Sequence, residues 1–143
     1  MRVQSSTLDK AVSLQYKIDG MITKNNLRPL LASLGYKKMK GSTEVWTRSF
    51  EASSSTITVD FAAEAIRYPK GLKINRATTT NFSQPENFVV LECITRLLSL
   101  GYTPQQLELE KSTPKGHGEG GGYCDIIIQD NGGKVFALVE CKT

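Results

Sequence analysis

The chain has 143 residues, enough for one domain with a substantial core. Its hydrophobic fraction of 39% and charged fraction of 22% are typical of a globular protein and argue against a disordered chain. No apolar stretch approaches the roughly 20 residues that a membrane helix needs, and the first ten residues hold no apolar signal core. We therefore expect a cytoplasmic protein without a membrane partner.

The cysteines favour the same compartment. Cys93, Cys124 and Cys141 are odd in number, lie in apolar runs and lack CxxC spacing, which predicts buried free thiols in a reducing cytosol. With His117 as the only histidine, this composition argues against a zinc site.

The net charge of +4 is unevenly distributed. Residues 1–80 contain 13 of the 18 Lys and Arg residues but six of the 14 Asp and Glu residues, a formal charge of +7. Residues 81–143 contain five basic and eight acidic residues, a formal charge of −3. A basic part that attracts phosphates beside an acidic part that holds a cation suits a metal-dependent nuclease, although chance surface charge is an equally good account.

The first part of the chain predicts a helix followed by a meander. Residues 7–18 are compatible with a short helix capped by Thr7, but their apolar spacing is weak. A second helix is predicted from Leu27 to Leu34, with Gly35 as its C-terminal cap. Alternating apolar residues then predict three strands, at 43–50, 56–61 and 66–68.

A polar, basic connector at residues 70–84 is the best candidate domain boundary. Ser83, Pro85 and Glu86 follow it with the signature of a helix start, and apolar residues at helical spacing continue to a cap at Gly101. The two predicted helices end alike, as LASLGY and LLSLGY, which a shared capping solution explains more simply than a duplication.

The rest of the second part predicts strands. We predict a strand at 107–110 and a glycine-rich loop at 113–122. Two apolar runs follow this loop. These runs flank Asn131-Gly132-Gly133, a turn signal that predicts a β-hairpin.

This hairpin carries the most informative charges. Glu140 and Lys142 are two residues apart on the second strand and share a face, and Asp125 lies on the neighbouring strand. Two carboxylates beside one ammonium suit a hard divalent cation and an activated water, as in phosphodiester hydrolysis. A strand end with merely solvated charges is the alternative. Glu86 is a helix-start acid that needs no function, and Glu110 either extends the acidic cluster or is solvated.

Four segments of the second part resemble the PD-(D/E)xK nuclease superfamily: PENFVVLECITRLLSLGY, ELEK, YCDIII and ALVECKT. The resemblance is to the N-terminal nuclease domain of type I restriction enzymes and of fused restriction methylase–nucleases with an adenine-methylase core. The segment GLKINRATTTNFSQPENFVV resembles the region upstream of that domain. The Pro-Asp pair that gives the superfamily its name is absent, since Tyr123 and Cys124 precede Asp125.

The resemblance implies roles for individual residues. Asp125 and Glu140 would ligate Mg²⁺, with the backbone carbonyl of Cys141 as a third ligand. Lys142 would orient or activate the attacking water and offset charge on the phosphate, and Glu86 would be the helix acid near the metal.

The sequence thus predicts a mixed α/β (α+β) chain. A basic helix-plus-meander module, residues 1–80, would pack on an incomplete restriction-endonuclease-like core, residues 81–143, truncated at the strand that carries Glu140 and Lys142. Such cores normally continue through another helix and strand, so we expect a fragment of a longer polypeptide, inactive or weakly active alone, whose final strand is left with one face uncovered.

The expected function is that of a Mg²⁺-dependent DNA endonuclease in restriction–modification. Its partners would be double-stranded DNA and methylase, helicase or specificity regions of the same chain or complex. The predicted DNA contacts are Lys70, Lys73, Arg76 and Lys115. The alternatives are a non-catalytic DNA-binding or assembly module and, less favoured by the basic leader, an interaction domain without nucleic acid.

Overall fold

The computed structural model describes residues 2–8, 11–17, 22–113 and 122–142. Its two α-helices are α1 (Lys24–Ser33) and α2 (Glu86–Ser99). Its strands are β1 (Arg2–Leu8), β2 (Ala11–Lys17), β3 (Lys37–Lys38), β4 (Val45–Phe50), β5 (Ser55–Asp60), β6 (Ala65–Arg67), β7 (Lys73–Ile74), β8 (Leu107–Thr113), β9 (Gly122–Gln129) and β10 (Val135–Lys142). Three 3₁₀ turns are η1 (Glu51–Ser53), η2 (Ala77–Thr79) and η3 (Pro104–Gln106). The mixed α+β fold class is confirmed.

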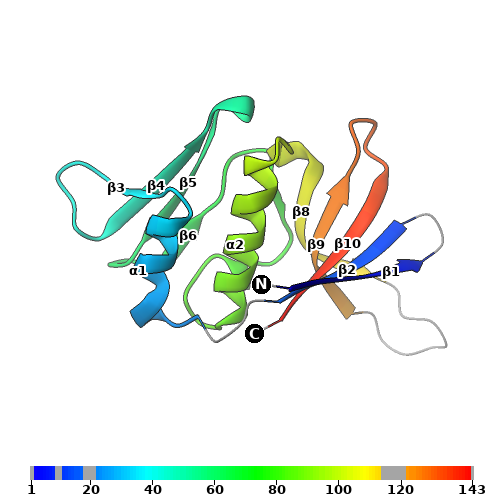
Figure 1. Ribbon diagram of the computed structural model, residues 1–143, viewed down its shortest axis with the longest axis horizontal. Helices are drawn as coiled ribbons and strands as arrows, with labels where there is room; N and C mark the ends of the chain where they lie inside the picture. The colour runs from blue at the N-terminus through cyan, green and yellow to red at the C-terminus, as the bar shows by residue number, and fades with distance from the viewer. Residues whose placement is uncertain (1, 9–10, 18–21, 114–121, 143) are drawn as a thin grey trace.

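The strands form two sheets. One has six strands in the order β1-β2-β10-β9-β8-β7, and the other is the antiparallel meander β3-β4-β5-β6. Figure 1 shows α2 between the two sheets, with α1 beside it on the side of the meander. In the described residues, no helix combines the length and the apolar character needed to cross a membrane.

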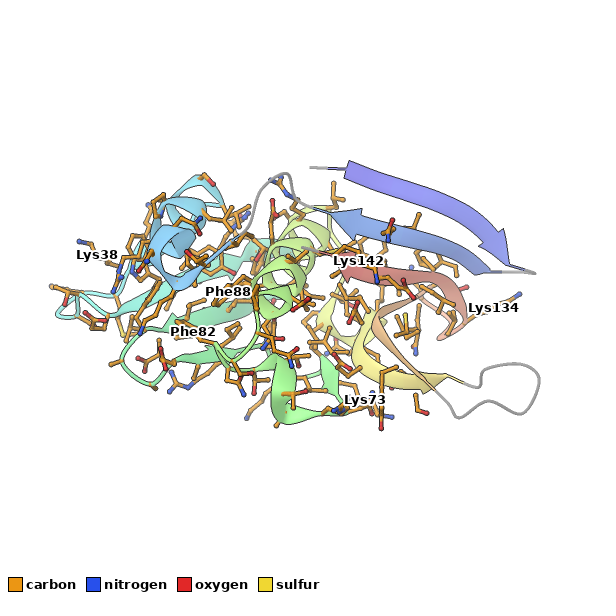
Figure 2. The ribbon with its side chains drawn as sticks, turned by 90° about the horizontal axis from the view of Figure 1, so that it is seen from below. Lys38, Lys73, Phe82, Phe88, Lys134 and Lys142 are labelled. Atoms are coloured by element: carbon orange, nitrogen blue, oxygen red, sulfur yellow. The ribbon has the colours of Figure 1, made fainter. Side chains whose placement is uncertain are left out.

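Helix α2 is the centre of the core because it is covered on both sides. Leu91 and Ile94 have no exposed surface, and Leu98 is 2% exposed. Burial of each such side chain contributes about 1.5–3 kcal/mol. At the start of the helix, Phe88 packs edge to face on Phe82, with ring centroids 5.2 Å apart (Figure 2). The helix therefore needs both sheets to bury its apolar surface.

Both helices end with the same capping structure, as their sequences predict. Gly35 and Gly101 have φ values of +86° and +105°, which non-glycine residues adopt only at a cost. The backbone N–H of Tyr36 donates to Leu31 O at 2.9 Å, and that of Tyr102 donates to Leu97 O at 3.2 Å. These bonds satisfy carbonyl groups at the helix ends.

The N-terminal segment corrects the prediction for residues 7–18. In place of a helix, the described part of this segment lies in strands β1 and β2, which pair antiparallel. Val12, Leu14 and Tyr16 alternate at the strand period, and β2 also pairs in parallel with β10, from Ala137–Val12 to Lys142–Lys17. This long-range pairing outweighs the weak local helix signal.

The same pairing changes the expected organisation. The six-stranded sheet contains strands from both sides of the predicted boundary at residue 80, and one apolar cluster contains core residues from both parts. Strand β10 has β9 on one edge and β2 on the other, and α2 contacts it. Ala137, Val139 and Cys141 on one face of β10 are buried, whereas Glu140 and Lys142 on the other face are exposed. The position beside the Glu140–Lys142 strand is thus filled by the N-terminal hairpin.

The predicted hairpin between β9 and β10 is confirmed. Asp130 organises its turn, because its Oδ1 accepts the backbone N–H groups of Gly132 and Lys134, each at 2.9 Å. Gly133 adopts a φ of +83°. The turn fixes the register in which Ile126 lies opposite Val139.

Candidate active site

Three acidic residues lie near one another on adjacent strands of the six-stranded sheet. Asp125 of β9 directly precedes Ile126, which pairs with Val139, so it lies beside the part of β10 where Glu140 follows Val139. On the other side of β9, Glu110 of β8 and Asp125 are the residues between the pairs Leu109–Ile126 and Lys111–Cys124. We call Glu110, Asp125 and Glu140 the carboxylate row. On β2, Gln15 is paired with Glu140 and extends the row by an amide.

Asp125 is the most constrained member of the carboxylate row. Its Oδ2 accepts the backbone N–H of Cys141 at 2.7 Å, which ties the side chain to the neighbouring strand. Burial raises the pKa of the Asp125 carboxyl above its usual range, and the charges of Glu140 and Glu86 raise it further. The Cys141 N–H and the Lys142 ammonium oppose this rise in pKa. The structure therefore brings all four predicted side chains into one electrostatic environment.

Glu140 and Lys142 lie at the solvent-exposed margin of this environment. The Lys142 Nζ is 3.7 Å from the Glu140 Oε2, and the side chains are 50% and 58% exposed, respectively. Two residues apart on β10, they lie on the same face of the strand, whereas Cys141 between them is buried. Both groups are accessible to a ligand from solvent.

Glu86 is the first residue of α2 and its carboxylate lies in the first helical turn. Its charge contributes to the raised pKa of Asp125, so the start of the helix lies near the carboxylate row. Glu92, the other acid of this helix, is 3% exposed and accepts two hydrogen bonds from Arg96, at 2.9 and 3.1 Å. Glu92 is therefore engaged in a local ion pair.

Glu110 belongs to the carboxylate row. It has a φ of +55°, a left-handed conformation that costs a non-glycine residue about 1–2 kcal/mol. Burial and the charge of Asp125 raise the pKa of Glu110, while Arg76 lowers it. The Arg76 Nη1 lies 3.8 Å from the Glu110 Oε2, and the guanidinium carbon of Arg76 lies 4.4 Å from the ring centroid of Tyr123. Backbone strain of this kind collects at functional sites.

The residues of the row fit a hard cation that takes few protein ligands. Mg²⁺ prefers oxygen and is often held by one or two carboxylates plus water. Asp125 and Glu140 supply two carboxylates on adjacent strands, and the second oxygen of Asp125 is not the one bonded to Cys141. In the described part of the chain, however, no set of three or more His, Cys, Asp or Glu side chains is arranged to hold a metal ion. Asp125 and Glu140 alone would leave the remaining positions around such an ion to water.

The cationic residues predicted to contact DNA differ in their exposure and in their distance from acidic groups. Lys73 lies 3.8 Å from the buried Glu108, and Arg76 lies near Glu110, so acidic groups partly neutralise both. Lys70 is exposed in a turn after β6. Lys115, like His117 and the glycine-rich loop at 114–121, lies outside the described residues.

Two features of the site were missed by the sequence prediction. Gln15 reaches the row through the parallel pairing of β2 with β10, for which the sequence holds no local signal. Glu108 is 5% exposed and accepts a hydrogen bond from the Asn75 amide at 2.9 Å. The spacing Glu108-x-Glu110 in an apolar strand was a signal that could have found it, since buried carboxylates require partners.

Comparison of the chain with family models, with curated proteins and with solved structures finds no match.

Proposed function

We propose that this chain is the Mg²⁺-dependent endonuclease domain of a restriction–modification enzyme, which hydrolyses phosphodiester bonds in double-stranded DNA. The supporting observation is the proximity of Asp125 to the end of β10, where its carboxylate accepts the Cys141 N–H between Glu140 and Lys142. Three hydrogen-bonded strands, β9, β10 and β2, fix these positions in the sheet. A rigid sheet meets the geometric requirement of such a site better than a loop does.

The chemistry of each side chain follows from its place. Mg²⁺, when bound, polarises the phosphate and lowers the pKa of a bound water. Asp125 offers a carboxylate whose orientation is already set by the Cys141 N–H, and Glu140 offers a second one. The Lys142 ammonium, close to Glu140, orients the attacking water and offsets negative charge that develops on the phosphate.

The proposal includes partners. The positive charge of residues 1–80 supports binding to a DNA duplex. We also propose that the domain acts beside methylase, helicase or specificity regions, in the same polypeptide or the same complex. Cleavage is therefore tested both on the 143-residue chain and on any longer polypeptide that contains it.

The test is cleavage of supercoiled DNA in the presence of Mg²⁺ by variants of Asp125 and Lys142. Asp125→Ala removes a metal ligand and Lys142→Ala removes the ammonium, so each should slow cleavage by roughly 100-fold or more. Duplex binding and the far-ultraviolet circular dichroism spectrum should stay close to those of the parent. Lys134→Ala removes one exposed lysine at the far end of the hairpin and serves as the charge-matched control (Figure 2). Measurable cleavage by the parent that Asp125→Ala and Lys142→Ala both leave unchanged would refute the assignment.

One observation favours a second candidate, a non-catalytic DNA-binding or assembly module. Each ligand carboxylate already has a partner, Cys141 N–H for Asp125 and the Lys142 ammonium for Glu140. If the chain is such a module, neither the 143-residue chain nor a longer polypeptide that contains it should cleave DNA. The parent should still bind duplex DNA, with an affinity that falls as salt rises. Each phosphate contact adds about 0.9 to the slope of log K against log salt. A flat salt response would remove the nucleic-acid function from both candidates.

A further inference from the structure

A polar cavity lies away from the carboxylate row, near the C-terminal end of α2. Its volume is about 560 Å³. It lies between the loop that joins β4 to β5, the segment after β6, and η3, and in Figure 1 that loop and η3 lie near the C-terminal end of α2. Glu86 begins α2, whose 14 residues span about 20 Å along the helix axis, so the cavity and Glu86 lie toward opposite ends of the helix.

The lining is rich in hydrogen-bond donors and positively charged. Hydroxyl groups come from the loop and from β5, a carboxamide comes from η3, and two cations come from β6 and the turn after it. The residues are Ser53, Ser54, Ser55, Thr56, Thr58, Arg67, Tyr68, Pro69, Lys70, Pro104 and Gln105. None of these described lining residues is acidic, so the cavity favours an anion.

Arg67 is held in place without being neutralised completely. Its NH1 lies 3.3 Å from the Asp60 Oδ2, while the other oxygen of Asp60 accepts the N–H groups of Ala62 and Ala63, both at 3.0 Å. Asp60 thus divides its charge between a turn and the guanidinium. The Arg67 side chain is 55% exposed and lies beside Thr58 on the adjacent strand. A guanidinium anchored in this way keeps donors available for an oxyanion.

Gly71 fixes the opposite wall of the cavity. Pro69 to Leu72 form a turn closed by the Leu72 N–H on Pro69 O at 3.3 Å, with Lys70 and Gly71 as its central residues. Gly71 has a φ of +94°, and a Cβ at this position would lie 2.6 Å from the Gln105 Nε2. Only glycine allows the carboxamide to approach so closely. The turn that presents Lys70 and the η3 segment that presents Gln105 therefore lie in close contact.

We propose that this cavity binds a phosphate group through Arg67, Lys70 and the hydroxyls of the β4–β5 loop. Serine and threonine hydroxyls, an amide and two cations are the groups that bind phosphate oxygens in proteins. The cavity is larger than a single phosphate, so it also has room for the sugar or base attached to it. DNA backbone, free nucleotides and inorganic phosphate share this chemistry. The inference goes beyond the nuclease proposal and does not depend on the carboxylate row.

The test is titration of the ¹⁵N-labelled chain with inorganic phosphate, with 5′-AMP and with a short DNA duplex. The amide chemical shifts of the chain are measured by NMR during each titration. Phosphate probes should shift the amides of residues 53–58, Arg67 and Gln105. Arg67→Ala and Lys70→Ala should each weaken binding by about tenfold, the loss of one charge-assisted contact, and Lys134→Ala by less than twofold. Asp125→Ala should bind as the parent does, so failure of the nuclease proposal leaves this result unaffected.

The probe that binds most tightly identifies the source of the phosphate. A duplex that binds well above inorganic phosphate assigns the cavity to the DNA backbone, whereas preference for 5′-AMP assigns it to a free nucleotide. Lys70→Glu, at an exposed turn position, replaces Arg67→Ala if loss of the Asp60 ion pair unfolds the chain. Absence of shifts at these amides with all three probes, or unchanged binding in the folded variants, would overturn the proposal.

Discussion

At the scale of single residues, Asp125 combines a structural bond with an unfavourable charge. Its hydrogen bond to the Cys141 N–H fastens β9 to β10 where their regular pairing ends. Burial, together with Glu140 and Glu86, nevertheless disfavours the ionised carboxylate. Without a cation, the ionised Asp125 carboxylate therefore lowers the stability of the folded chain. A bound cation would offset its repulsion with Glu140 and Glu86 and raise that stability.

Asp125→Asn should therefore stabilise the metal-free chain at neutral pH. Asparagine retains an oxygen that accepts the Cys141 N–H and removes the buried charge. Because the pKa of Asp125 is raised on folding, the folded state binds its proton more tightly than the unfolded state. The stability of the parent then falls as pH rises from the unfolded pKa of about 3.9 through the folded pKa. The melting temperature of the variant should exceed that of the parent at pH 7, and the difference should shrink toward pH 4.

Thermal unfolding between pH 4 and 8 without divalent ions measures this difference, with Glu51→Gln as an exposed control for the loss of one carboxylate. Added Mg²⁺ should then stabilise the parent but not Asp125→Asn. At ten times its Kd, the ion would stabilise the parent by about 1.4 kcal/mol. A variant that melts below the parent at pH 7 would show that ionised Asp125 contributes net stability.

At the scale of elements, each helix is delimited by chemistry that the sequence displays. Pro85 and Glu86 begin α2, while Leu100 and Gly101 end it with a capping structure that α1 repeats at Leu34 and Gly35. A helix stopped at a defined residue places its first turn reproducibly. For α2, that turn carries Glu86 toward the carboxylate row.

Gly101→Ala should destabilise the protein by about 1–2 kcal/mol. A Cβ at Gly101 meets no atom within 4 Å, so the cost comes only from the φ of +105°. The expected fall in melting temperature is about 2–8 °C for a chain of this size. Gly132→Ala is the matched control, because Gly132 lies in a turn outside the left-handed region. Equal melting temperatures for both variants would contradict the capping role, and far-ultraviolet circular dichroism during heating measures them.

At the scale of the whole molecule, the N-terminal hairpin and the C-terminal strand depend on each other. β2 pairs with β10 over six positions that include Glu140 and Lys142, and β10 joins this hairpin to β9 and β8. The sheet is therefore completed by segments at opposite ends of the sequence. Such long-range pairing keeps the strand that carries two candidate catalytic residues from being an exposed edge.

Leu14→Pro should loosen β10 selectively. Leu14 lies between Ser5 on β1 and Val139 on β10, and proline removes a backbone donor from this ladder. Amides of residues 138–142 should exchange about tenfold faster or more, while those of β8 and β9 keep most of their protection. Leu14→Ala retains the backbone donor and serves as the control. Hydrogen exchange read by mass spectrometry or NMR measures the effect, and unchanged protection in β10 would contradict the pairing.

The sequence alone determined the features that depend on neighbouring residues. Gly35 and Gly101 ended their helices, Pro85 and Glu86 began α2, and Asn131 to Gly133 formed the predicted turn, since capping and turn preferences act over a few residues. The two-residue period likewise fixed the shared face of Glu140 and Lys142. The mixed fold class followed from these elements.

Tertiary structure decided what depends on distant partners. Residues 11–17 became a strand because β10 offered a free edge, and the same pairing brought Gln15 to the carboxylate row. The order of six strands placed Glu110 beside Asp125, and the close approach of Gly71 to Gln105 brought together segments more than 30 residues apart at one cavity. Local propensities differ by less than the free energy gained when whole strands pair and bury a face. Three-dimensional pairing therefore determined the composition of the sites.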